Sequence, residues 1–342
     1  MTTLAVHQYI SRRDSQVKTE QLFCDKAVNY IYSSTRENAP QLFNMLTSAR
    51  VSSLLGYINY DSPFGAGLSK TMRTAQELGI DMTECIRQPK YFDSHRKLFE
   101  RQIQYWYYRP MPEAQDIICS PADSRMFTGS MDDRSLLFIK EKFFDMAELF
   151  GEEQERWLRT FYGGSYGLFR LTPEKYHYNH IPVSGRVEDI YEVDGKYHAC
   201  NPGALIELAE PCSKNKRTVT IINTDVPGGT GCGYVAMIEI VALMIGKITQ
   251  QYSENMYENP TKLERGMFVR KGQPKSLFQP GSSMVLLVFE EDRIRFSDDI
   301  IWNQGRTDVE SRYSLNFERP LVETEVDVRS GIGRARSPQN IR

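Results

Sequence analysis

Three short polar segments contain the residue types that could do chemistry. Asp123 follows an apolar run and a proline turn, His177 and His180 stand three residues apart, and Gly281-Ser282-Ser283 precedes a second apolar run. A carboxylate, an imidazole and a hydroxyl can form a nucleophilic triad in which the imidazole takes the hydroxyl proton. Each segment also has a plainer interpretation: a turn aspartate, hydrogen-bonded histidines, and a turn before a strand.

Two other kinds of site find less support in the sequence. A histidine pair at this spacing could bind a metal on a helix, but Pro173 and Pro182 flank it and indicate a loop or extended segment. No third ligand is close in sequence, so we predict no metal. The run Gly228–Gly233 resembles a phosphate-binding loop, but neither Lys-Ser/Thr nor a helix follows it. We expect a flexible turn between strands there.

The order of the three polar segments is informative in itself. An apolar run leads into Pro121-Ala122-Asp123, residues 171–185 read Leu-x-Pro-x-x-Tyr-His-x-x-His-x-Pro-x-x-Gly, and residues 278–283 read Phe-Gln-Pro-Gly-Ser-Ser. This combination resembles the phosphatidylserine decarboxylase family, whose members make their own pyruvoyl prosthetic group. The resemblance covers residues 110–305 well. It departs from the family pattern at three positions. Ser124 stands where Gly is usual, Pro280 where Leu or Gly is usual, and Ser283 where Thr is usual.

The resemblance implies two reactions at one site. In the first, Ser282 attacks the carbonyl of Gly281, His180 takes the hydroxyl proton, and Asp123 orients the imidazole. The cut would leave a β chain of residues 1–281 and an α chain of 61 residues that begins with a pyruvoyl group derived from Ser282. In the second, this covalent group withdraws electrons from the bond to the leaving carboxylate. His177 would deliver a proton, since imidazole titrates near neutrality. Neither pyridoxal phosphate nor a metal is required.

The implied activity is that of a lyase of phospholipid biosynthesis, converting phosphatidylserine to phosphatidylethanolamine and CO₂. Residues 87–109 carry six basic, two acidic and seven aromatic side chains, a composition that suits an anionic membrane surface. The same aromatics could instead pack a helical layer onto the core. One alternative keeps the chemistry but uses a soluble aromatic amino acid. A remote alternative is a non-catalytic lipid-binding relative, against which the intact Asp123, His177, His180 and Ser282 argue.

Composition sets the remaining limits. The 342 residues are 40% apolar and 25% charged, which predicts a packed core, and a net charge of −2 argues against a nucleic-acid partner. No apolar run is long enough to span a membrane and no secretory signal is evident, so we expect a protein peripheral to the cytoplasmic face of a membrane, or otherwise cytoplasmic. Six cysteines without a C-x-x-C pair predict reduced thiols. The possibility of a homo-oligomer stays open.

The fold class expected from these patterns is α+β, with an N-terminal helical layer packed on a mostly antiparallel β catalytic core. The expected regions are a helical region over 1–110 with membrane-surface contact, a catalytic core over 111–330, and a flexible tail over 331–342. Apolar spacing predicts helices over 17–36, 40–56, 68–77, 93–105 and 143–159. Strand-forming runs occupy 116–119, 136–140, 166–171, 186–193, 217–223, 234–245 and 284–289.

Overall fold

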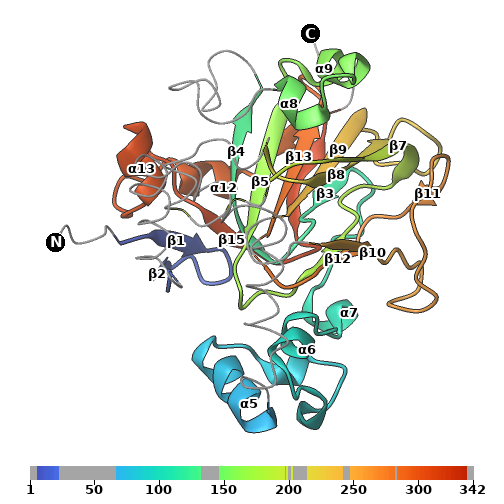
Figure 1. The fold of residues 1–342 in the computed structure, drawn as a ribbon. Coiled ribbons are helices and arrows are strands. Elements are labelled where there is room, and N and C mark those ends of the chain that lie inside the picture. Colours follow the sequence, from blue (N-terminus) through green and yellow to red (C-terminus); the bar gives the residue numbers. More distant parts are fainter. Residues whose placement is uncertain are drawn as a thin grey trace.

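The fold is mixed α+β, with mostly antiparallel sheets and several short helices (Figure 1). The computed structural model describes residues 6–22, 67–131, 146–196, 198, 202, 214–241, 247–281 and 283–336. Statements about the structure below refer to these residues.

A ten-stranded sheet forms the body of the molecule, in the order β11-β7-β8-β9-β13-β5-β4-β15-β1-β2. Its neighbours pair antiparallel except β1 and β15, which pair parallel. The strands are β1 (Gln8–Ser11), β2 (Val17–Thr19), β4 (Ser124–Ser130), β5 (Ser165–Leu171), β7 (Gly185–Val193), β8 (Arg217–Asn223), β9 (Tyr234–Val241), β11 (Phe268–Val269), β13 (Ser283–Phe289) and β15 (Thr324–Val326).

Two three-stranded sheets accompany the large one and carry much of the site. The first has the order β10-β12-β6 and the second the order β14-β16-β3. Their strands are β3 (Ile117–Cys119), β6 (Tyr178–His180), β10 (Ile248–Gln250), β12 (Pro274–Phe278), β14 (Ile294–Phe296) and β16 (Gly331–Ala335).

Strand β13 is a buried apolar run inside the large sheet. It lies between β9 and β5, and all seven of its residues are buried. Successive side chains of a strand point to opposite faces. Met284, Leu286 and Val288 accordingly join one hydrophobic core, while Val285, Leu287 and Phe289 join the other. The uninterrupted apolar run is therefore a central strand of the large sheet.

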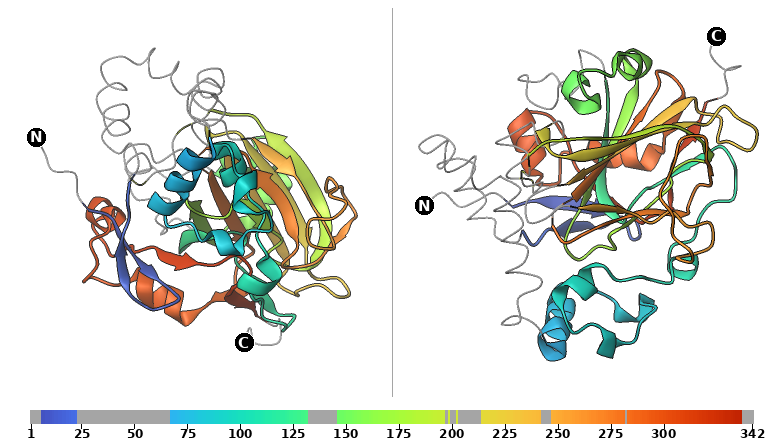
Figure 2. Two further views of the ribbon diagram at one scale, coloured as in Figure 1. Left: turned by 90° about the horizontal axis from the view of Figure 1, so that it is seen from below. Right: turned by 45° about the vertical axis from the view of Figure 1, so that its right-hand side comes forward.

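Short helices surround the sheets, and one group of them forms an appendage. Helices α5 (Leu68–Glu77), α6 (His95–Phe99) and α7 (Tyr105–Tyr108), with the 3₁₀ turns Met82–Glu84 and Pro89–Tyr91, lie together at one end of the β structure (Figures 1 and 2). The remaining helices are α8 (Met146–Phe150), α9 (Glu155–Phe161), α12 (Asp298–Gln304) and α13 (Arg312–Phe317). No helix in the described ranges is long and apolar enough to cross a bilayer.

Several predicted elements are confirmed. Helix α5 has the predicted bounds, and Gly79 follows it at a φ of 68°, which suits glycine. Strand β8 also has the predicted bounds, and β5, β7, β9 and β13 lie where strands are predicted. The glycine-rich run after β8 is a turn between strands, as expected. The expected helix at 40–56 and the expected strand at 136–140 lie outside the described residues.

The N- and C-terminal segments differ from the expectation. Val17–Thr19 is strand β2, not the start of a helix, because β1 and β2 extend the large sheet beside β15. The helical interpretation of 1–110 is therefore wrong over 8–19. Gly331–Ala335 is strand β16, paired with β14 and β3, rather than part of a flexible tail. Both segments are short, and partners far away in the sequence decide their conformation.

Candidate active site

Asp123 ends a tight turn between β3 and β4. The Ser120 hydroxyl donates to the Ala122 carbonyl inside this turn at 2.8 Å. The Ser120 N–H donates to the Ser330 carbonyl, and the Val328 N–H donates to the Asp123 carboxylate at 2.7 Å. The turn is thus held by the segment that connects β15 to β16, more than 200 residues later.

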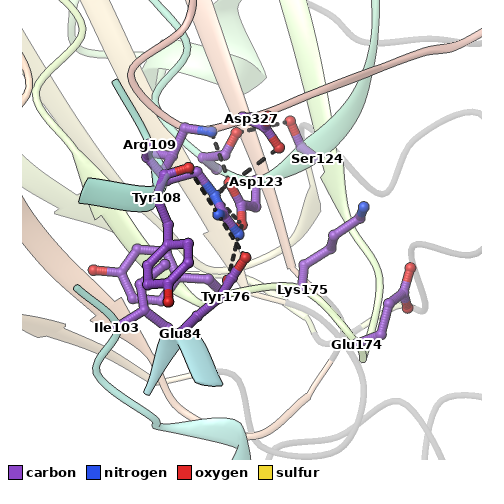
Figure 3. A network of polar contacts seen from close by, with 12 residues as sticks. Glu84, Ile103, Tyr108, Arg109, Asp123, Ser124, Glu174, Lys175, Tyr176 and Asp327 are labelled. Carbon is purple, nitrogen blue, oxygen red and sulfur yellow. Dashed lines mark hydrogen bonds and ion pairs between the residues drawn. The ribbon is translucent and has the colours of Figure 1, made fainter. Parts of the chain in front are cut away.

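The main partner of the Asp123 carboxylate is Arg109. The guanidinium donates through Nε at 3.0 Å and through a terminal nitrogen at 2.8 Å, and it also pairs with Glu84 at 2.9 Å (Figure 3). Asp327 lies on the edge of this cluster, 3.9 Å from Arg109. Burial opposes ionisation of Asp123, but the Arg109 charge and hydrogen bonds outweigh burial and hold the pKa of Asp123 below its ordinary value.

His180 lies on β6, against the turn that carries Asp123. Its backbone N–H donates to the Pro121 carbonyl, and its Nδ1 lies 2.9 Å from the Gly272 carbonyl. Because a carbonyl oxygen only accepts, this contact places the proton on Nδ1 and leaves Nε2 as the acceptor, 3.1 Å from the Tyr176 hydroxyl. Burial lowers the pKa of His180 to about 3, so the ring is neutral at neutral pH.

His177 lies just before β6 in a different environment. Its ring stacks on Phe99 of α6 at a centroid distance of 3.6 Å, and neither ring nitrogen has a hydrogen-bond partner among the described residues. Burial, and then the nearby charge of Arg101, lower the pKa of His177 well below its ordinary value. The expectation that His177 titrates near neutrality is therefore wrong for this state of the protein, because the helical appendage covers the ring.

A buried polar cluster fixes strand β6 between the two histidines. Asn179 donates to Glu239 of β9 at 2.9 Å and to the Ser276 hydroxyl of β12 at 3.1 Å, and Lys275 pairs with Glu239. Lys275 and Glu239 are both fully buried. Glu239, which interrupts the apolar run of β9 in the sequence, thus anchors the small sheet to the large one.

The Gly281–Ser282 segment joins β12 to β13. The last residue of β12, Phe278, donates its N–H to the His177 carbonyl. Gly281 has a φ of 149°, a conformation that favours glycine, and Ser283 begins β13 opposite Leu171 and Val241. The Ser283 hydroxyl is buried and has no partner within the described ranges. Ser282 itself lies outside the described residues.

The structure brings three of the predicted groups into one buried region. Asp123, His177 and His180 are all buried, and the Asp123 charge acts to raise the pKa of both imidazoles. The direct bond expected between Asp123 and an imidazole is not among the contacts of these residues. The Asp123 carboxylate instead accepts hydrogen bonds from Arg109 and from the Val328 N–H, and His180 Nδ1 donates to the Gly272 carbonyl.

Sequence reasoning missed Arg109 and Gly272 as parts of the site. Gly272 has a φ of 78°, and a side chain there would collide with Met111 and approach Arg329. The sequence predicts that Arg109 belongs to a basic and aromatic membrane-facing surface over 87–109, but Arg109 is buried, so this prediction is wrong for part of the segment. Five of its side chains are buried against the core, namely Phe92, Phe99, Arg101, Tyr105 and Arg109. A lone glycine or arginine in a sequence carries no signal for a contact formed at such distance.

Comparison with known proteins identifies the family. The family model described as phosphatidylserine decarboxylase matches residues 96–310. A phosphatidylserine decarboxylase proenzyme of Ruminiclostridium cellulolyticum is 29% identical over 86% of this chain and 91% of its own length. One from Fusobacterium nucleatum is 26% identical over the same shares of the two chains. Proenzyme 2 of rice is 33% identical over 67% of this chain and 34% of its own length.

The match spans more than half of the chain and includes Arg109, Asp123, His177, His180 and residues 281–283. The protein belongs to the phosphatidylserine decarboxylase family. Members of this family are pyruvoyl-dependent carboxy-lyases, and the resemblance carried by the three polar segments of the sequence is confirmed.

Proposed function

We propose that the protein is a self-processing decarboxylase that converts phosphatidylserine to phosphatidylethanolamine and CO₂ at a membrane surface. The observation that carries the proposal is the burial of Asp123, His177 and His180 in one region, with the His177 carbonyl hydrogen-bonded to Phe278, three residues before Gly281. The family match extends over this whole region.

In the maturation step, His180 is the base for Ser282. Its Nδ1–H donates to the Gly272 carbonyl, so Nε2, which lies 3.1 Å from the Tyr176 hydroxyl, carries the electron pair that would accept the Ser282 proton in place of a bond from Tyr176. Its low pKa keeps it unprotonated at neutral pH. Asp123 supplies a negative charge that stabilises the imidazolium as it forms, and Arg109 and Val328 keep that carboxylate ionised and fixed.

In the decarboxylation step, the chain holds a pyruvoyl group at position 282. The unpartnered Ser283 hydroxyl and the unpartnered ring nitrogens of His177 fit such a group, because both offer hydrogen bonds that nothing in the described part of the chain takes up. When bound, the group supplies a ketone that accepts the electron pair of the breaking bond. His177, whose buried ring stacks on Phe99, would pass the proton.

Contact with the membrane is assigned to the helical appendage. Tyr91, Trp106 and Tyr107 are 46%, 40% and 74% exposed, and Arg87 and Lys90 lie near Tyr91 in the exposed part of the same segment. Aromatic and basic side chains together suit the interface of an anionic bilayer. A soluble aromatic amino acid is the alternative substrate, and it is tested by supplying free amino acids and phosphatidylserine vesicles separately and measuring CO₂.

Intact-mass analysis of purified protein tests the maturation step. We expect two fragments, with the cut between Gly281 and Ser282 and a blocked N-terminus on the smaller one. Ser282→Ala should stay one chain, whereas the matched control Ser283→Ala should still be cut before residue 282. A single full-length mass in catalytically active protein would contradict the proposal.

The two histidines are separated by a paired experiment. His180→Ala should remain one chain because it lacks the base. His177→Ala should be cut but should release CO₂ slowly from phosphatidylserine. The reverse result, with His177→Ala uncut and His180→Ala cut, would exchange the two roles.

A further inference from the structure

Arg329 stands beside His180 without belonging to the maturation machinery. Its side chain donates to the Tyr105 carbonyl at 3.0 Å, and its guanidinium lies 4.8 Å from the centre of the Tyr105 ring. The same ring meets the His180 ring edge-on at a centroid distance of 4.7 Å. The guanidinium is therefore one ring away from the imidazole, and its charge contributes to the lowered pKa of His180.

The backbone at Arg329 is held in an unfavourable conformation. Its φ is 71°, in the left-handed region that glycine adopts without strain and that L-residues with a side chain rarely adopt. Two hydrogen bonds hold it there, from the Arg329 N–H to the Ser120 carbonyl and from the Ser120 N–H to the Ser330 carbonyl. Strained residues of this kind concentrate at ligand-binding and catalytic sites, where the surrounding structure maintains them.

The positive charge of Arg329 is not neutralised by a carboxylate in the described part of the chain. Its Nε is buried and has no partner there. Of the two other arginines near the histidines, Arg109 has carboxylate partners, whereas Arg101 has none in the described part of the chain but is almost fully buried. Arg109 is paired with Asp123 and Glu84, and Arg101 is buried and donates to the Leu98 and Glu174 carbonyls. Arg329 alone of these three combines a spare donor with partial exposure.

Space for a ligand lies next to this residue. Nε of Arg329 and Sδ of Met111 both lie against Gly272. Met111, Asp327 and Ser330 line an open cavity of about 690 Å³. Arg329 itself does not line this cavity, but Asp327 and Ser330 on either side of it do, so a space large enough for a polar headgroup borders the segment that carries Arg329.

We propose that Arg329 binds the phosphodiester of the phospholipid headgroup, an inference that rests on the proposed function. A guanidinium makes two parallel hydrogen bonds to phosphate oxygens, which suits its spare donors. The substrate carboxylate is the less suitable anion. A cation on it would stabilise the ground state, and that stabilisation is lost as the negative charge leaves the carboxylate. The phosphodiester keeps its charge throughout the reaction.

Steady-state kinetics on the mature enzyme test this assignment. Arg329→Gln should be cut like the wild type, and its KM for phosphatidylserine in mixed micelles should rise about 10- to 100-fold with little change in kcat, since a uniform binding contact is lost. Glycerophosphoethanolamine, which has a phosphodiester but no carboxylate, should lose inhibitory potency by a similar factor. Arg159→Gln is the matched control, because Arg159 is an exposed arginine of α9 that pairs with Glu155 and does not line this cavity. It should leave KM and inhibition unchanged.

A second variant guards against misfolding. Arg329→Gly removes the same charge and suits the left-handed backbone, so it should unfold at the same or a higher temperature while reproducing the raised KM. An unchanged KM in both variants overturns the proposal. A raised KM with unaltered inhibition by glycerophosphoethanolamine also overturns it, because the contact is then with the carboxylate. Failure of the wild type to be cut or to release CO₂ would instead refute the proposed function.

Discussion

Two buried clusters of arginines and carboxylates use the same chemistry in different places. In the Arg109 cluster, one guanidinium joins Asp123 and Glu84 at the candidate site. In the Arg170 cluster, one guanidinium of β5 joins Glu20 and Glu323, with hydrogen bonds of 2.6–2.9 Å to Glu20. His7 adds a 2.9 Å contact to Glu323, and Arg125 adds an ion pair to Glu20 at 2.5 Å.

The two clusters differ in which parts of the chain they connect. The Arg109 cluster links the helical appendage to the turn that carries Asp123. Its three central charged groups precede Gly281 in the sequence, and Asp327 at its edge follows Gly281. In the Arg170 cluster, Glu323 follows the proposed cut and its partners precede it. Under the proposed function, the Arg109 cluster would position Asp123, while the Arg170 cluster would hold the smaller chain to the larger one after cleavage. Burial and charge alone do not distinguish these roles.

The Arg170 cluster also contains a group of side chains that could bind a metal. Ligand atoms of His7, Glu20 and Glu323 all lie within 4.8 Å of one another. Their carboxylate oxygens, however, already accept hydrogen bonds or ion pairs from Arg170 and Arg125. The arginines supply the positive charge that a cation would bring, so the arrangement is that of an ion-pair network.

The largest expected effect separates the two carboxylates of the Arg109 cluster, Asp123 and Glu84. Asp123→Asn should slow self-cleavage by about three orders of magnitude or more, because loss of the charged member of a triad costs that much in other systems. Glu84→Gln removes the other carboxylate of Arg109 and should be cut at a rate close to wild type. Cleavage is followed by the appearance of two bands on a denaturing gel. Equal rates for Asp123→Asn and Glu84→Gln would remove the distinction between positioning and structure within this cluster.

The second prediction concerns the Arg170 cluster. Arg170→Met should lower the free energy of unfolding by about 3–5 kcal/mol, because it leaves Glu20 and Glu323 buried with fewer partners. At a temperature where this variant stays folded, it should still be cut. Urea unfolding and gel analysis provide the two measurements, with Arg12→Met, which breaks the more exposed pair with Asp299, as the control. A folded but uncut Arg170→Met would show that this cluster also serves the chemistry.

The third prediction uses pH to compare the clusters. The pKa values of Glu20, Glu323 and Asp123 are all below their ordinary values, because the arginine charges outweigh burial. Groups of this kind contribute stability that is present above their unfolded pKa of about 4 and is lost as the pH falls through the folded values. Unfolding free energy should therefore decline below about pH 4. The unfolding free energy of Arg170→Met should decline less steeply than that of Glu84→Gln. The reason is that Arg170→Met removes the charge that contributes most to lowering the pKa values of both Glu20 and Glu323. Identical slopes would contradict this.

The sequence and the structure agree most where a local pattern decides the result. The bounds of α5 and β8 follow from apolar spacing and a terminal glycine or turn, and the extended segment around His177 and His180 follows from its flanking prolines. The contacts of Arg109 could not be predicted, because a basic residue among aromatics also fits a membrane surface. The same holds for β1, β2 and β16, which are strands because distant segments pair with them.

The smallest expected effect concerns the outer face of the helical appendage, whose inner face contributes Arg109 and Phe99 to the site. Trp106 and Tyr107 of α7 are exposed, whereas Tyr105 beside them is buried. Trp106→Ala and Tyr107→Ala should each weaken binding to anionic vesicles by a few-fold, because each removes a side chain suited to the interface. Raising the salt should weaken the binding of the wild type, since exposed charges such as Arg87 are screened over about 10 Å at 0.1 M.

Vesicle co-sedimentation measures both effects. The control is Tyr162→Ala, which removes an exposed aromatic side chain next to α9 at the other end of the β structure. Self-cleavage should be unchanged in all three variants, because none of these side chains contacts Asp123 or either histidine. Equal losses for Tyr162→Ala would assign membrane binding to general hydrophobicity rather than to the appendage.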